Sequence, residues 1–123
     1  MWWLNSMGEE PPRGKDILDR DRLRDVLGDD AATREFLMSV LPNMAQLCAR
    51  IEAVRDSSAL RELAHELKGA AGNIGARELA AAAAALESAL KIGAPEASHA
   101  IESAVEHILE ACTRFSVAVR EIS

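Results

Sequence analysis

Aromatic residues are scarce in this chain, which contains two Phe, two Trp and no Tyr among its 123 residues. β-Branched residues are also thinly spread, whereas Ala, Leu and Glu are abundant. Aromatic and β-branched side chains favour strands, while Ala, Leu and Glu favour helices, so the composition argues against a sheet. Because 49% of the residues are hydrophobic, the length fits one domain with a real core, and we expect an all-α fold.

The chain also lacks a basic stripe and a long apolar run. Its net charge of -6 argues against a nucleic-acid partner, because such binding depends on Lys and Arg that neutralise phosphates. The longest apolar run, residues 79–86, is mostly Ala and far shorter than the ~20 residues of a membrane-spanning helix. The N-terminal Trp2, Trp3 and Leu4 form too short an apolar stretch for a signal peptide. We therefore expect a cytoplasmic protein without membrane insertion.

Cysteine is rare as well, and the two cysteines, Cys48 and Cys112, form no Cys-x-x-Cys motif. Both fall among apolar positions of expected helices, which favours buried, reduced thiols over a disulfide. The chain further lacks the Gly-x-x-x-x-Gly-Lys-Ser/Thr loop of nucleotide-binding proteins and any evident carboxylate cluster for a metal. We therefore expect neither kinase activity nor a cofactor of its own.

Prolines and glycines divide the chain into an arm and a helical region. Residues 1–14 include Pro11, Pro12 and Gly14, and we expect them to form a flexible N-terminal arm. Residues 15–123 are expected to fold as one helical domain. Its first element is expected to be a short helix from about Asp16 that stops at Gly28.

Four longer helical segments follow, each marked by apolar residues at helical spacing. The expected helices are 30–55 with a kink at Pro42, a helix that follows a turn and cap at 56–58 and runs to about Asn73, a helix over 76–91, and a last helix to about Glu121 with Pro95 in its first turn. Short turns between the segments predict an antiparallel up-and-down four-helix bundle, with the short helix across one end. The repeated alanines of 80–85 indicate close packing between helices.

A lone histidine, His65, is followed by Lys68 and Gly69 on the expected helix that ends at about Asn73. The apolar side of that helix is set by Leu60, Leu63, Leu67, Ala70 and Ile74. At ~100° per residue, His65 lies roughly 155° from the centre of this side and should face solvent. Lys68, Gly69 and Gly72 fall on the same outward side. Each helical glycine costs roughly 1 kcal/mol relative to alanine, so the two glycines indicate close approach of a partner.

Glu87, on the next expected helix, stands at the same level as His65. The turn between the two helices is centred near Ala76, and both residues are eleven positions from it. Adjacent helix axes lie ~8–10 Å apart, so the carboxylate of Glu87 can reach the imidazole. A carboxylate that accepts a hydrogen bond from Nδ1–H fixes the tautomer in which Nε2 keeps its lone pair.

These motifs resemble the histidine-containing phosphotransfer (HPt) domain of bacterial two-component phosphorelays. The resemblance rests on His65-x-Leu67-Lys68-Gly69, Asn-Ile-Gly-Ala at 73–76 and Leu-Glu at 86–87, and it covers most of 16–123. It implies that His65 is the phosphoacceptor, that Lys68 offsets phosphoryl charge, and that Glu87 assists the histidine. The chain departs from the family at 70–72, where Ala-Ala-Gly replaces the Ser or Thr that many relatives carry after the Lys-Gly pair.

The resemblance also implies partners. Response-regulator receiver domains and a hybrid sensor histidine kinase are expected, and Mg²⁺ is expected on the receiver and not on this chain. A receiver is expected to dock over Gly69 and Gly72, with Arg61 in the same docking surface. The chain would then act as a phosphohistidine carrier and not as an autonomous kinase. The individual kinase and receivers, and the direction of phosphate flow, stay open.

Two alternatives stay open on sequence grounds. A similar bundle could bind receivers, or drain phosphate from them, without onward transfer. A metal-binding four-helix bundle is the second alternative, because Glu62-x-x-His65 and Glu96-x-x-His99 match the Glu-x-x-His motif of di-iron proteins. The outward position expected for His65 argues against the metal site, since metal ligands of such bundles point inward.

Overall fold

The computed structural model describes residues 13–92 and 97–122. Its elements are the helices α1 (Gly14–Ile17), α2 (Arg20–Leu27), α3 (Asp30–Ala53), α4 (Ser57–Asn73), α5 (Arg77–Ile92) and α6 (Ala97–Arg120). These described residues contain no strand, and the expected all-α fold is confirmed. Residues 1–12 of the expected arm lie outside the described residues, as does Pro95, which was expected in the first turn of the last helix. Gly14, the last residue of the expected arm, is the first residue of α1.

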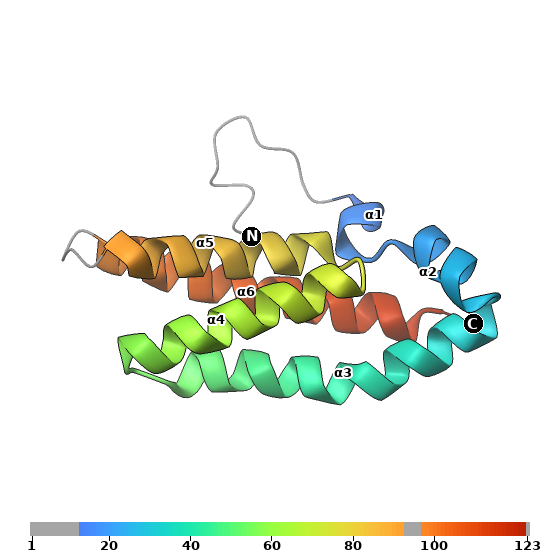
Figure 1. Ribbon diagram of the computed structural model, residues 1–123, viewed down its shortest axis with the longest axis horizontal. Coiled ribbons are helices and arrows are strands. Elements are labelled where there is room, and N and C mark those ends of the chain that lie inside the picture. The colour runs from blue at the N-terminus through green and yellow to red at the C-terminus, as the bar shows by residue number, and fades with distance from the viewer. Residues whose placement is uncertain (1–12, 93–96, 123) are drawn as a thin grey trace.

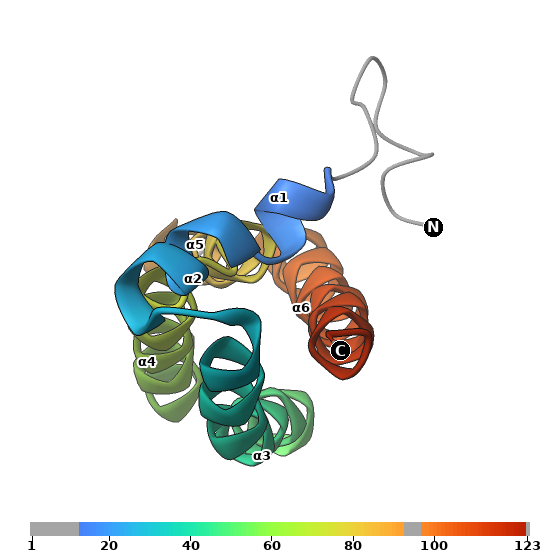
Figure 2. The same cartoon turned by 90° about the vertical axis from the view of Figure 1, so that its right-hand side faces the viewer.

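The long helices α3, α4, α5 and α6 lie side by side in a ring around one core (Figures 1 and 2). Each helix packs against the next, and α6 closes the ring against α3. Successive helices run in opposite directions (Figure 1). At one end of the ring, α1 contacts α5 and α6, and α2 contacts α3. Within the two described ranges, no helix combines the length and apolar character needed to cross a membrane.

Aspartate side chains cap the N-termini of α3 and α4. The side chain of Asp29 accepts a hydrogen bond from the backbone N–H of Ala32 at 2.7 Å, at the start of α3. Asp56 does the same for Ala59 at 2.9 Å, at the start of α4. Such caps satisfy N–H groups that have no partner within the helix. As expected, Pro42 does not end α3, which continues to Ala53.

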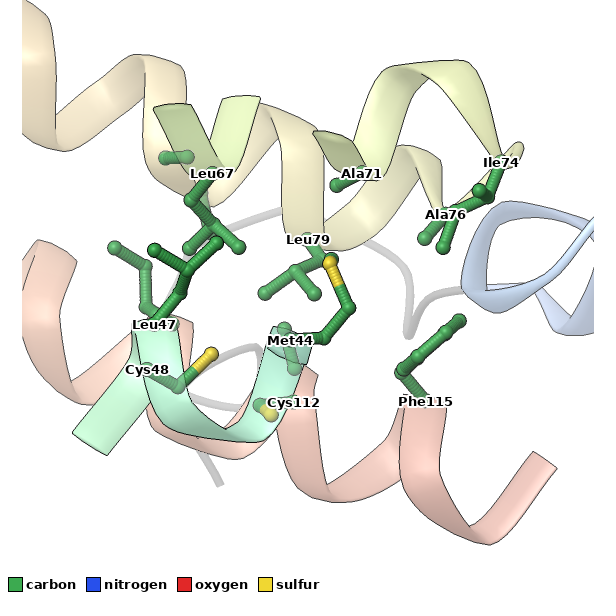
Figure 3. Close-up of a cluster of buried hydrophobic side chains, with 14 of the residues drawn as sticks. Met44, Leu47, Cys48, Leu67, Ala71, Ile74, Ala76, Leu79, Cys112 and Phe115 are labelled. Carbon is green, nitrogen blue, oxygen red and sulfur yellow. The ribbon is translucent and has the colours of Figure 1, made fainter. Parts of the chain in front are cut away.

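Leucine, alanine and a few larger side chains fill the core between the helices (Figure 3). Leu67 of α4, Leu79 of α5 and Phe115 of α6 are each almost completely buried. Ala82 and Ala83 of α5 have no exposed surface, whereas Ala81 and Ala85 are exposed, so the expected close packing holds for part of the alanine run. Along α4, Ala64 and Ala71 are fully buried, whereas Ala70, which was expected on the apolar side, is only partly buried against the core.

The two cysteines lie in this core. Cys48 on α3 and Cys112 on α6 are both free and buried, so the prediction of buried thiols is confirmed (Figure 3). The neighbouring Cys112 thiol, together with burial, raises the pKa of Cys48 far above its usual range. Cys48 therefore stays protonated and serves as a small apolar side chain.

The prediction of one short helix from Asp16 to Gly28 is wrong, because the chain forms two helices with a break at Leu18 and Asp19. Leu18 has an extended backbone, with φ -157° and ψ 118°, and Asp19 caps α2 by accepting from the N–H of Arg22 at 3.3 Å. The Asp19 carboxylate also accepts a hydrogen bond from Arg77 at 2.8 Å, and its backbone N–H donates to the carbonyl of Gly75. These contacts fix the N-terminal helices to the turn between α4 and α5.

A tight turn sets the register between α4 and α5. Gly75 has φ 77°, a left-handed conformation that favours glycine, and its N–H donates to the carbonyl of Gly72. The N–H of Ala76 donates to the carbonyl of Ala71 at 2.9 Å, which completes a Schellman motif. A Cβ at Gly75 would lie 3.1 Å from Cβ of Asp19, a tight contact that adds to the conformational preference for glycine.

Candidate functional site

His65 lies in the middle of α4 on its outward side. Its side chain is 71% exposed, whereas Leu63 and Leu67 on either side of it are buried. The expected outward position of His65 is therefore confirmed. An exposed imidazole on a rigid helix is accessible to another protein, and its orientation then depends on the groups beside it.

Glu87 of α5 orients the ring. Its Oε2 lies 2.8 Å from Nδ1 of His65, as the register of the two helices predicts. A carboxylate can only accept a hydrogen bond, so Nδ1 carries the proton and donates it. The remaining nitrogen, Nε2, keeps its lone pair and is the nucleophilic atom of the ring.

Lys68 pairs with the same carboxylate. Its Nζ donates to Oε1 of Glu87 at 2.8 Å, while the other oxygen accepts from His65. The Lys68 side chain is 40% exposed and that of Glu87 only 11% exposed. The structure therefore brings His65, Lys68 and Glu87 together in one cluster, which we call the His65 triad. The sequence analysis did not predict the contact between Lys68 and Glu87.

Glu87 is the negatively charged member of the triad. Lys68 first, and His65 second, lower the pKa of Glu87 from 4.5 to about 2, against the opposing effect of burial. Glu87 is thus ionised at neutral pH, and its charge is matched by the ammonium of Lys68. Its second oxygen is well placed to stabilise positive charge that develops on the imidazole.

The expected docking glycines lie on open surface. Gly69 and Gly72 are both exposed, and a Cβ built on either would have no atom within 4 Å. The packing of the chain itself therefore does not require glycine at these positions. Their absence of side chains leaves the surface beside His65 free of bulk.

Arg61 lies on the other side of His65 from these glycines. It lines an open hollow of about 720 Å³ between α4 and α5, together with Ser58, Glu62, His65, Glu66, Glu87 and Lys91. Arg61 precedes His65 by one helical turn, and Lys91 follows Glu87 by one turn. The structure thus places a cation from each helix in this hollow. Lys91 is absent from the residues singled out by sequence, because an isolated lysine near a helix end resembles any solvated charge.

The two histidines of the alternative metal site lie on different helices. His65 points outward on α4, His99 is exposed on α6, and Glu96 lies outside the described residues. In the part of the chain that the structure describes, no three His, Cys, Asp or Glu side chains are grouped as metal ligands would be.

Comparison with known proteins relates the chain to a protein family. A family model described as "Hpt domain" matches residues 32–115, which include most of the four long helices and all of the His65 triad. No curated protein and no solved structure matches the chain.

Proposed function

Because the chain belongs to the Hpt domain family, we propose that it is a phosphorelay carrier in which His65 accepts a phosphoryl group from a receiver-domain aspartate and passes it to another receiver. Membership of this family means histidine phosphotransfer in a two-component phosphorelay, with response-regulator receivers as partners. The observation that carries the residue assignment is the His65 triad. One ring nitrogen is held by Glu87, and the other is left as an exposed nucleophile.

The transfer step follows from this geometry. The lone pair of His65 Nε2 attacks phosphorus in line, the Nε2–P bond forms, and the P–O bond of the aspartyl phosphate breaks with its electron pair returning to the aspartate. The Nδ1 proton stays on the ring, where Glu87 stabilises the positive charge that the ring gains. Phosphoryl transfer depends mostly on positioning and on charge stabilisation, and the fixed ring and the nearby Lys68 ammonium supply both.

This chemistry makes the chain a carrier and not a kinase. The aspartyl phosphate, and the Mg²⁺ expected beside it, belong to the receiver, and a hybrid sensor histidine kinase is the proposed source of the phosphoryl group upstream. The open surface at Gly69 and Gly72 supports docking of a receiver there. Arg61, in the hollow beside His65, supports a second contact on the opposite side of the histidine.

Incubation with a phosphorylated receiver tests the proposal. We expect label to appear on this chain, to be lost in acid as phosphohistidine is, and to be absent in His65→Gln. Addition of a second, unphosphorylated receiver should then remove the label from this chain and place it on that receiver. Binding without label would contradict the carrier role, and label that is only hydrolysed would favour a phosphate-draining bundle.

Glu87→Ala tests the role of the carboxylate. The variant leaves Nδ1 of His65 without its acceptor, so the ring is no longer held in one tautomer and orientation. We expect transfer to slow by about tenfold or more, by analogy with other histidines that lose an orienting carboxylate. Circular dichroism should show a folded bundle, since both partners of Glu87 are exposed enough to be solvated. An unchanged transfer rate would remove Glu87 from the mechanism.

A further inference from the structure

The Lys68 ammonium is already paired in the unphosphorylated chain. Its Nζ lies 2.8 Å from Oε1 of Glu87, and Oε2 of the same carboxylate lies 2.8 Å from Nδ1 of His65. The carboxylate is thus engaged at both oxygens, on a side chain that is only 11% exposed. A carboxylate in such a position depends on its cation, because a charge that is largely removed from water is costly when it is left unpaired.

A phosphoryl group on Nε2 would bring a second anion to the same lysine. A phosphoryl group carries about -1.5 to -2 charges at neutral pH and binds strongly to ammonium groups. Lys68 lies one helical turn from His65, so its ammonium is the nearest described cation on α4 that follows the histidine. Any contact that Lys68 makes with the phosphoryl oxygens must be made at the expense of its contact with Glu87, or shared with it.

We propose that Glu87 sets how strongly His65 retains its phosphoryl group, by competing with that group for Lys68. This inference rests on the proposed carrier function and adds a control on it. When Lys68 turns to the phosphoryl oxygens, Glu87 loses its cation, and the phosphohistidine form becomes easier to discharge to a receiver aspartate. The covalent step itself is unchanged. Glu87 therefore acts through Lys68 as a positioning residue, in addition to its contact with the ring.

Glu87 also has a direct effect on the ring, and the two effects must be separated. The competition for Lys68 disfavours the phosphohistidine, whereas the direct effect favours it. The carboxylate attracts the positive charge of the phosphorylated imidazole and so favours the phosphohistidine. Glu87→Gln retains an oxygen that can accept from Nδ1–H, but it removes the charge that holds Lys68. The effect of Lys68→Met on the transfer equilibrium is therefore measured twice, once in wild type and once in Glu87→Gln. The two proteins compared in each case have the same residue at position 87, so the direct effect of that residue on the ring cancels.

The experiment is a double-mutant cycle on the transfer equilibrium. Wild type, Lys68→Met, Glu87→Gln and the double variant are each mixed with one receiver that has been phosphorylated by acetyl phosphate and freed of it. The equilibrium ratio of phosphohistidine to aspartyl phosphate is then measured. We expect Lys68→Met to lower this ratio about fivefold more in the Glu87→Gln background than in wild type, because there Lys68 is free to serve the phosphoryl group.

A matched control tests whether the effect of Lys68→Met depends on the contact between Lys68 and Glu87 or only on the loss of a nearby positive charge. Lys91→Met removes one positive charge from the hollow that His65 and Glu87 line, one turn beyond Glu87 on α5, and should change the ratio equally in both backgrounds. Equal effects of Lys68→Met in both backgrounds would overturn the competition while the carrier function stands. Absence of any label on wild type would overturn the carrier function and the competition with it.

A spectroscopic readout follows the lysine directly. The ¹⁵N resonance of Lys68 Nζ should shift when His65 is phosphorylated in wild type, and the shift should be smaller in Glu87→Gln, in which the ammonium does not leave a carboxylate. An Nζ resonance that is unaffected by phosphorylation in wild type would overturn the proposal even if transfer itself is normal. The receiver-free chain, phosphorylated with phosphoramidate, provides the sample for this measurement.

Discussion

Among single residues, Glu87 is the one whose charge defines the site, because it contacts both His65 and Lys68. Its pKa of about 2, below the ordinary 4.5, is caused first by Lys68 and second by His65. A depressed carboxylate pKa contributes stability that is present above pH 4.5 and is lost as the pH falls toward 2. In Lys68→Met we expect the pKa of Glu87 to rise. A ¹³C titration of its carboxyl carbon measures this, and Lys91→Met should leave it at about 2. An unchanged midpoint in Lys68→Met would contradict the assigned cause.

Spacing in the sequence predicts part of this cluster. Helical periodicity places His65 outward, and equal distances from Ala76 place Glu87 at its level. The pairing of Lys68 with Glu87 depends on side-chain rotamers, and the sequence does not specify these. A lysine three residues from the histidine can reach either a neighbouring carboxylate or a bound phosphoryl group. The structure shows that, in the unphosphorylated chain, Nζ of Lys68 contacts the carboxylate, at Oε1 of Glu87.

Among the helices, α4 carries a glycine that its own packing does not need. Gly69 is in the interior of α4, and a Cβ there would contact nothing. Gly69→Ala should therefore raise the free energy of unfolding by about 1 kcal/mol, which urea denaturation measures.

If a receiver docks over this position, Gly69→Leu should slow transfer at least tenfold. Ala100→Leu is the control, since Ala100 is exposed on α6, diagonally opposite α4 (Figure 2). Equal rates in the two leucine variants would exclude docking at Gly69.

The helix ranges were predictable to different degrees. The helical spacing of apolar residues predicts the ends of α3, α4 and α5 to within a few residues, because each helix must bury one side against its neighbours. The break between α1 and α2 was not predicted, because it depends on partners of Asp19 that are distant in sequence. Arg77 is 58 residues away, and Gly75 belongs to the same distant turn. Local sequence alone favours continuing the helix through Asp19.

Across the whole molecule, a buried ion pair fixes α5 to α6. Glu78 accepts from Nε and Nη2 of Arg114 at 2.9 and 2.8 Å, and its side chain is 5% exposed. The two residues are 36 positions apart, and each resembles a solvated surface charge in the sequence. This pair lies outside the His65 triad, so its role is in stability and orientation of the helices.

Removal of one partner of this pair should cost more than removal of both. Arg114→Met leaves the Glu78 carboxylate buried without its cation, and we expect a loss of about 3 kcal/mol in urea unfolding. Glu78→Leu combined with Arg114→Met removes both charges of this pair, so the double variant should lose less than the single variant. Arg120→Met, which removes an exposed arginine from the same helix, should change stability by less than about 0.5 kcal/mol. A double variant as unstable as Arg114→Met would mean that the stem of the arginine, through its packing, supplies the stability and not the paired charge.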